Sequence, residues 1–277
     1  PVQVGALTNW LEVASGAVGS LAIKTDGTLW SFGRNVFGQL GLGNTTDYSS
    51  PVQVGALTTW SKIAAGTAHS LAVKTDGTLW AWGEGSFGKL GDGTTANKSS
   101  PVQIGALTNW LQVVGGYGQS LAIKTDGTLW SWGYNPFGQL GLGSTTYYSS
   151  PVQVGALTTW SKIAAGRLHS LASKTDGTLW CWGYNATGQL GQGNTTNYSS
   201  PVQVGALTTW SKVGGGQTHS LAIKTDGTLY SWGYNSGGQL GIGDTANRSS
   251  PVQVGALTTW SILAKSSSPL SSSALQL

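Results

Sequence analysis

The chain has 277 residues, of which 9% are charged and 39% are hydrophobic, and its formal net charge is +4. Its 14 Trp and small net charge argue against disorder, which combines low hydrophobicity with high net charge. The lone Cys181 excludes an internal disulfide framework, and no apolar run approaches the roughly 18 residues of a membrane-spanning helix. The sequence opens in mid-repeat at Pro1, which predicts a processed chain or a piece of a longer protein.

Five blocks of 50 residues and a remainder of 27 make up the sequence. Each block begins PVQxGALTxW, continues through SLAxKTDGTL and GxLGxG, and ends in a polar run closing with SS. A period of 20–50 residues indicates a solenoid, a propeller or an array. The blocks are 1–50, 51–100, 101–150, 151–200 and 201–250, followed by a partial copy at 251–264.

The first block predicts four short strands, which in chain order are Leu11–Ser15, Ser20–Lys24, Thr28–Phe32 and Val52–Val54. In the second and third strands, side chains of different character alternate, which is the period of a strand. Between them, Asp26–Gly27 predicts a tight hairpin, because Gly accepts positive φ and Asp can bond its own backbone. No segment has a 3.6-residue apolar period, so no helix is expected.

Four-stranded units repeated without helices predict an all-β fold, a β-propeller of five complete blades plus a composite or partial sixth. We expect the equivalents of Val13 and Trp30 to fill the space between sheets. The leftover strands Val2–Val4 and Ser261–Ala264 would meet in the sixth blade; a longer parent chain with more blades is the alternative. The Ser-rich tail 265–277 has lost the repeat pattern and forms either a poor extra strand or a disordered segment.

Differences between the copies concentrate at block positions 17–19, 34–37, 42, 44 and 46–48. These positions fall in the connections from the first to the second strand and from the third to the fourth. In an up-and-down sheet both connections emerge at one end, while the unvaried KTDGT and GALT segments emerge at the other. Because binding residues lie on loops held by a rigid scaffold, we interpret the variable face as the binding face. Simple tolerance of the loops to substitution is the alternative.

Eight of the nine Tyr lie in these variable segments, among Asn, Ser, Thr and Gly. This composition is typical of adaptable binding surfaces, because Tyr offers a large contact area at low entropic cost, and it suits stacking on sugars. The sequence therefore predicts a face that binds a protein or a glycan. The candidate ligand-binding residues are Arg34, Tyr48, Glu84, Lys98, Tyr117, Tyr134, Tyr148, Arg167, Tyr184, Tyr198, Tyr234 and Arg248.

Catalytic and metal-binding patterns are missing from the sequence. The ten carboxylates are scattered, with no pair for glycoside hydrolysis and one turn Asp per block, too few for Ca²⁺. His69, His169 and His219 share block position 19; we expect them far apart, buried and hydrogen-bonded rather than joined in a metal site. Cys181 has no patterned partner and is expected to be a small buried residue. We therefore predict no enzyme activity, no metal and no cofactor.

Thirteen-residue strings such as SFGRNVFGQLGLG and SWGYNPFGQLGLG, and the stretches GTAHSLAVKTDG, GRLHSLASKTDG and GQTHSLAIKTDG, resemble the signature of the regulator-of-chromosome-condensation repeat. The resemblance covers residues 1–260 and recurs five times. It implies a propeller, commonly of seven blades in this family. The namesake is a nucleotide-exchange factor for the GTPase Ran, but the uniform 50-residue blocks leave no room for its extra hairpin wedge, and its basic tail is absent. The G-W-R-H-T signature of the related plant light receptor is absent too.

Residues and resemblance together predict a non-catalytic binding or scaffold propeller. Near-identical copies and few charges suggest a bacterial or bacteriophage-like protein at an extracellular location or a virion surface. Lys and Arg do not cluster, so no nucleic-acid partner is expected. A structural subunit that self-assembles into a fibre or capsid decoration is one alternative, and an exchange factor of the Ran-regulator type is the other.

Overall fold

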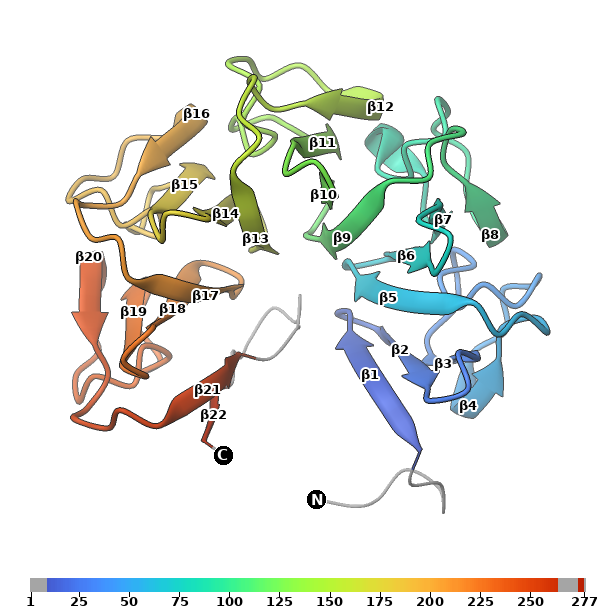
Figure 1. Cartoon of the computed structure of the whole chain (residues 1–277), viewed down its shortest axis with the longest axis horizontal. Helices are drawn as coiled ribbons and strands as arrows, with labels where there is room; N and C mark the ends of the chain where they lie inside the picture. Colours follow the sequence, from blue (N-terminus) through green and yellow to red (C-terminus); the bar gives the residue numbers. More distant parts are fainter. Residues whose placement is uncertain (1–8, 264–273, 277) are drawn as a thin grey trace.

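The computed structural model describes residues 9–263 and 274–276, which form five antiparallel sheets of four strands arranged around a central axis (Figure 1). Each sheet is one blade, and its strands follow chain order from the innermost to the outermost. Blade 1 contains β1 (Trp10–Ser15), β2 (Gly19–Lys24), β3 (Leu29–Gly33) and β4 (Tyr48–Gln53). Blade 2 contains β5 (Trp60–Ala65), β6 (His69–Lys74), β7 (Leu79–Gly83), the 3₁₀ turn η1 (Ser86–Gly88) and β8 (Lys98–Gln103).

The remaining blades repeat this order. Blade 3 contains β9 (Trp110–Gly115), β10 (Gln119–Lys124), β11 (Leu129–Gly133) and β12 (Tyr148–Gln153). Blade 4 contains β13 (Trp160–Ala165), β14 (His169–Lys174), β15 (Leu179–Gly183) and β16 (Tyr198–Gln203). Blade 5 contains β17 (Trp210–Gly215), β18 (His219–Lys224), β19 (Leu229–Gly233) and β20 (Arg248–Gln253). The all-β propeller predicted from the repeat is confirmed.

The fourth strand of each blade is longer than the sequence pattern predicts. The pattern places it at Val52–Val54, but β4 begins at Tyr48 and runs through Ser-Ser-Pro. It pairs with β3 from Gly33 opposite Tyr48 to Trp30 opposite Gln53, with a register shift between them. Pro51 fits there because β4 is an edge strand, where a missing backbone N–H is tolerated.

The predicted Asp-Gly hairpin forms between β2 and β3. Gly27 has φ +78°, and its N–H donates to the Lys24 carbonyl at 2.9 Å. Oδ1 of Asp26 accepts bonds from the Thr28 hydroxyl at 2.6 Å and the Thr28 N–H at 2.9 Å, which lower the pKa of the carboxyl. A Cβ on Gly27 would collide with the Thr58 carbonyl of the next connection. The turn is therefore fixed both by its own bonds and by its neighbour.

Tryptophans fill the space between blades at the predicted position, where Trp80, Trp130 and Trp180 pack against clusters shared by two blades, and also two residues further along the strand. Trp82, Trp132, Trp182 and Trp232 are completely buried, whereas the equivalents of Trp30 are half-buried. The indole N–H of Trp82 and the hydroxyl of Ser70 both donate to the Gln39 carbonyl of the preceding blade, at 2.9 and 2.8 Å. These bonds join neighbouring blades within an apolar interface.

The half-buried tryptophans also hold the repeated lysine. Nζ of Lys74 lies 3.6 Å from the ring centroid of Trp80 and 5.0 Å from that of Trp60. The two rings meet edge to face at 6.0 Å. Equivalent contacts recur in the other four blades, so five of the 14 basic side chains lie over aromatic rings and add no basic patch.

At the end of the series, β21 (Trp260–Leu263) pairs with β22 (Ala274–Gln276), a strand from the predicted tail. The strand predicted at Val2–Val4 for a composite sixth blade lies outside the described residues. Val13 on β1 is largely exposed, although its equivalent Ile63 is buried against the preceding blade. The first blade thus lacks, among the described residues, the cover that the later blades have. In this same part of the chain we find no helix that is long and apolar enough to cross a membrane.

Candidate binding face

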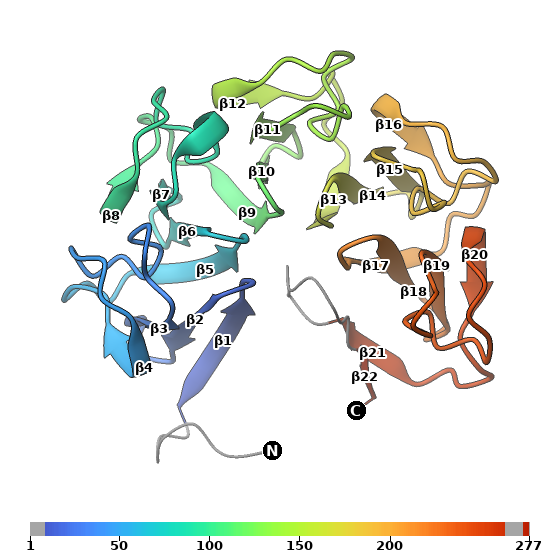
Figure 2. The same ribbon diagram turned by 180° about the vertical axis from the view of Figure 1, so that it is seen from behind.

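The connections between strands emerge at two opposite ends of the blades, as the alternating chain direction requires (Figures 1 and 2). At one end, the Arg34 N–H donates to the Val18 carbonyl, joining the two variable connections; we call this end the loop face. At the other end, the Trp60 N–H donates to the Gly27 carbonyl, joining the two unvaried connections; we call it the turn face.

Backbone bonds also link the loop face from blade to blade. The Thr67 N–H donates to the Gly116 carbonyl at 3.1 Å. Tyr117 donates in the same way to Arg167 at 3.3 Å, and Arg167 to Gln217 at 3.3 Å. The inner loops of blades 2 to 5 therefore form a connected series, which fixes the positions from which their side chains project.

Four aromatic rings and one guanidinium gather on this face from three blades. Tyr134 is central, with centroid distances of 4.6 Å to Phe87, 5.2 Å to Tyr147 and 6.1 Å to Tyr117. The guanidinium carbon of Arg167 lies 5.2 Å from the Tyr117 ring. We call these five residues the aromatic cluster.

Phe87 lies in an exceptional turn of blade 2, although its contact with the next blade is not exceptional, because Phe137 meets Tyr184 in the same way at 4.7 Å. Phe87 has φ +61°, the only positive φ of a non-glycine residue in the described part of the chain. Blades 1, 3, 4 and 5 carry Gln at block position 39, whereas blade 2 has the buried Lys89. Its ammonium pairs with Glu84 at 2.6 Å and lies 5.9 Å from the Phe87 ring. The Glu84–Lys89 pair thus accompanies the unusual turn that carries Phe87.

The cluster presents a neutral aromatic surface with the Arg167 guanidinium at its side. Phe87 and Tyr147 are each 43% exposed and Tyr117 is 37% exposed, while Tyr134 is half-buried between them. Burial raises the pKa of Tyr134, and Tyr147 and Tyr117 add to this shift, so the phenol is neutral at pH 7. Such a surface can pack against apolar groups and donate hydrogen bonds through its hydroxyls.

The structure divides the predicted site residues into groups. Tyr117, Tyr134 and Arg167 come together in the aromatic cluster, while Glu84 pairs with Lys89 next to it. Tyr184 forms a separate pair with Phe137 at 4.7 Å, Arg34 is exposed, and Tyr234 contacts Ser236. The five residues at block position 48 begin the outermost strands instead of lying in loops: Tyr48, Lys98, Tyr148, Tyr198 and Arg248.

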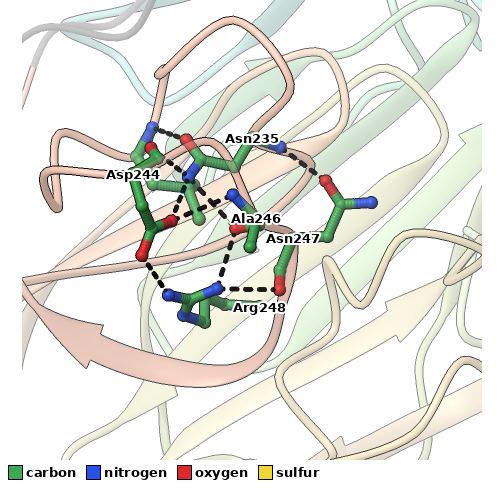
Figure 3. Close-up of polar contacts among 6 residues, drawn as sticks. Asn235, Asp244, Ala246, Asn247 and Arg248 are labelled. Carbon is green, nitrogen blue, oxygen red and sulfur yellow. Dashed lines mark hydrogen bonds and ion pairs between the residues drawn. The ribbon is translucent and has the colours of Figure 1, made fainter.

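Residues of this outer group stabilise their own loops. Figure 3 shows Arg248 paired with the Asp244 carboxylate and donating to the Ala246 and Asn247 carbonyls. Lys98 pairs with Asp92 at 3.3 Å, and the Tyr48 hydroxyl accepts a bond from the Asn44 amide at 3.2 Å. The predicted set is therefore not one contiguous site.

Sequence reasoning misses two members of the cluster. Phe87 is not among the candidate residues, although Phe at block position 37 occurs in three copies within a variable segment. Tyr147 is one of the eight loop Tyr but is not among the candidates either. Adjacency of Phe87 to Tyr134 needs two blades side by side, and no spacing within one block could reveal it.

Other reactive side chains lie inside the fold. His69 is buried, with Nε2 3.0 Å from the Ser120 hydroxyl, which itself donates to the Lys89 carbonyl. The Nε2 must therefore carry the proton of that bond. Burial lowers the pKa of His69, and that of His169, to about 3. The expectation of wide separation is wrong for His169 and His219, because His219 lies near enough to act on the pKa of His169, lowering it through its charge and raising it through a backbone hydrogen bond.

Cys181 is also buried, and burial raises the pKa of its thiol. It therefore stays protonated at neutral pH and is a poor nucleophile. Among the residues that the structure describes, no group of three or more His, Cys, Asp or Glu side chains is placed to hold a metal ion.

Solved structures of similar fold come from proteins of low sequence identity. Human WBSCR16 has a TM-score of 0.85 and 24% identity, over 97% of this chain and 71% of that one. Yeast RCC1 (Prp20) bound to Kap60 has a TM-score of 0.75 and 19% identity, over 94% and 78%. Prp20p from Saccharomyces cerevisiae has 0.72 and 19%, over 97% and 83%. No curated protein matches the sequence.

Family models give the direct assignment. The model described as "Regulator of chromosome condensation (RCC1) repeat" matches residues 26–73, 76–123, 126–173, 176–223 and 226–264. A second model of the same description matches 11–39, 60–89, 110–139, 160–189 and 210–239. These matches cover most of the chain and follow its 50-residue period. The chain therefore belongs to the regulator of chromosome condensation (RCC1) repeat family.

Proposed function

We propose that this chain is a non-catalytic binding module that holds a protein partner on its loop face, with the aromatic cluster at the centre of the contact. The observation that carries the proposal is the gathering of Phe87, Tyr117, Tyr134, Tyr147 and Arg167 from three blades onto one exposed surface. Tyr and Arg are enriched among the residues that dominate binding energy at protein interfaces. The connected backbone beneath them lowers the entropic cost of binding.

Relatives of the same fold support a protein as the class of partner. Yeast RCC1 (Prp20) has been solved with Kap60 bound to it, and Prp20p has binding properties toward Gsp1p and histones. Those partners belong to those proteins, and only the class of ligand is carried over. An extracellular or virion-surface location, suggested by the composition, would present the loop face to a foreign protein.

The test is to probe a protein array and a glycan array with the labelled chain and with two triple variants. The first variant, Phe87→Ser, Tyr117→Ser and Tyr147→Ser, removes the exposed aromatic rings. The second, Tyr48→Ser, Tyr148→Ser and Tyr198→Ser, makes the same kind of change at the outer strands and serves as the control. We expect protein binders whose affinity falls at least tenfold with the first variant and less than threefold with the second.

Thermal unfolding of both variants provides the check on folding. Binding that survives loss of the cluster would overturn the proposal, as would an absence of any protein binder that depends on it. Binders found only on the glycan array and lost with the first variant would replace the protein partner by a glycan at the same surface.

A further inference from the structure

A concave site lies between neighbouring blades, beside the connection from the outermost strand of one blade to the innermost strand of the next. A pocket of about 340 Å³ lies between blades 1 and 2, and one of about 330 Å³ lies between blades 2 and 3. We call these the rim pockets. The side chains that matter in the first are Gln53, Leu57, Trp60, Trp80, Ser100 and Pro101. Their counterparts 50 residues later line the second: Gln103, Leu107, Trp110, Trp130, Ser150 and Pro151.

Packing within the fold does not explain why each rim pocket carries a leucine. Leu57 is 48% exposed and Leu107 is 49% exposed, and the equivalents Leu157, Leu207 and Leu257 are similarly exposed. The residue is nevertheless Leu in all six copies. Single exposed apolar side chains are ordinary, but here each lies beside a half-buried Trp in a concavity. Each rim pocket therefore has an apolar wall that faces solvent.

The charge of the lining residues indicates which class of ligand the rim pockets can bind. Among the described residues, no ionisable side chain lines the pocket between blades 1 and 2. In the next pocket Asp92 takes the place of Leu42, and its carboxylate is already paired with Lys98 at 3.3 Å. A phosphorylated or acidic ligand would find no cation among these lining residues. Lys74 and Lys124 are already held over the rings of Trp80 and Trp130, at 3.6 and 3.7 Å. The pockets therefore suit a neutral ligand.

Hydrogen-bonding groups accompany the apolar wall. The amide nitrogen of Gln103 donates to the Gly105 carbonyl at 3.1 Å, which fixes the amide and leaves its carbonyl oxygen as an acceptor. The hydroxyl of Ser150 and the backbone of the glycine-rich segment contribute further polar groups. One apolar wall with a few fixed polar groups is the usual design of a small-ligand site.

We propose that the rim pockets each bind one pyranose ring of a neutral glycan. The C–H face of the sugar packs on the Trp and Leu wall, and its hydroxyls bond to the Gln and Ser side chains. Volumes of about 330–340 Å³ fall at the small end of the roughly 300–1,000 Å³ typical of ligand sites, which suits a single ring. An extended peptide would need a continuous groove instead of separate pockets.

Because the blades repeat, one chain offers several rim pockets to the same glycan. The lining residues recur between blades 3 and 4, with Leu142, Gln153, Leu157, Trp160 and Trp180 at the matching positions. Weak sites that engage one polymer together bind it far more tightly than any one site alone. The rim pockets do not include the aromatic cluster, so this inference stands independently of the loop-face proposal.

The experiment compares the chain with two variants by saturation-transfer NMR against methyl pyranosides and by a glycan array. Leu57, Leu107, Leu157 and Leu207 are replaced together by Ser in the test variant. The control is Leu111→Ser, a residue that is 51% exposed and that is already Ser in copies 2, 4 and 5. We expect transfer from at least one pyranoside, a loss of affinity of tenfold or more in the test variant, and no change in the control.

The contrary outcomes are distinct. No transfer from any pyranoside would overturn the proposal, and so would equal binding by the test variant when circular dichroism shows that it is folded. Binding of a polyproline peptide at the leucine wall in place of sugars would assign the pockets to peptide recognition. The Phe87→Ser, Tyr117→Ser and Tyr147→Ser variant should keep full sugar binding, which separates failure here from failure at the loop face.

Discussion

The turn face and the loop face are carried by the same blades, yet their contacts differ in kind. On the turn face, side chains repeat one arrangement: Thr28 and its four equivalents donate to the turn Asp at 2.6–2.7 Å through the hydroxyl. On the loop face, position 34 is Arg, Glu or Tyr, but its backbone N–H donates to the carbonyl of position 18 at 2.8–2.9 Å in every blade. Position 34 can vary because its backbone makes this bond, whereas the Asp and Thr of the turn make theirs through the side chains.

The buried histidines at block position 19 test the comparison between the two faces most severely. This position varies between copies, as loop-face positions do, but its histidines are buried in the core. A folded-state pKa of about 3 for His169, against 6.5 in the unfolded chain, means that only the unfolded state takes up a proton in between. This stabilisation is complete above pH 6.5 and is lost as the pH falls toward 3. Each such histidine should cost about 3 kcal/mol between pH 7 and pH 4.

Urea unfolding at the two pH values measures this loss. His169→Gln copies Gln119, which bonds the Gly166 carbonyl of the next blade at 3.0 Å without a titratable group. The variant should lose less stability on acidification than the parent chain. An unchanged pH dependence would mean that His169 is accessible to protons in the folded state.

Glycines of the two faces give a direct comparison. Gly127 and Gly143 have φ values of +75° and +74°, but a Cβ would strike the Thr158 carbonyl at the first and would meet only Ser200 Oγ, at 3.6 Å, at the second. Gly127→Ala should lower the free energy of unfolding by about 2 kcal/mol or more, and Gly143→Ala by about 1 kcal/mol. Chemical denaturation measures both; equal losses would contradict the proposed difference between the faces.

The side-chain bonds of the turn face should contribute less. The Thr128 hydroxyl donates to Asp126 at 2.7 Å and accepts from the Trp130 indole at 2.9 Å. Thr128→Val removes both bonds and should cost about 1 kcal/mol, while Thr128→Ser should retain most of the stability. If the Val variant keeps the stability of the parent chain in thermal unfolding while the Ser variant loses it, the methyl group and not the hydroxyl holds the turn.

The smallest effect is expected at the exposed part of the loop face. Tyr147→Ala should change the free energy of unfolding by no more than about 0.5 kcal/mol, because nearly half of the side chain contacts water. A larger loss in the same unfolding assay would show that the aromatic cluster holds blade 3 together, which would weaken its assignment as a binding surface.

The sequence predicted the first three strands of a blade and the separation of the two faces well, because both follow from local pattern, but it missed the start of β4 by four residues. Alternation placed β2 and β3 to within one residue at each end, and the Asp26–Gly27 pair predicted the turn. Alternation also puts Trp80 and Trp82 on the same side of a strand, but it cannot say which one is buried. The preceding blade decides that, because its Gln39 carbonyl and Gly41 lie against Trp82, while Trp80 remains at the rim pocket.

The repeat, the turns and the positions free to vary were determined by the sequence alone, since each depends on neighbours within one block. Which variable residues meet was decided only by the tertiary structure. Phe87 and Tyr134 belong to different blades, and their contact requires the ring to bring the two loops together. The same holds for the rim pockets, whose walls come from consecutive blades and exist in neither alone.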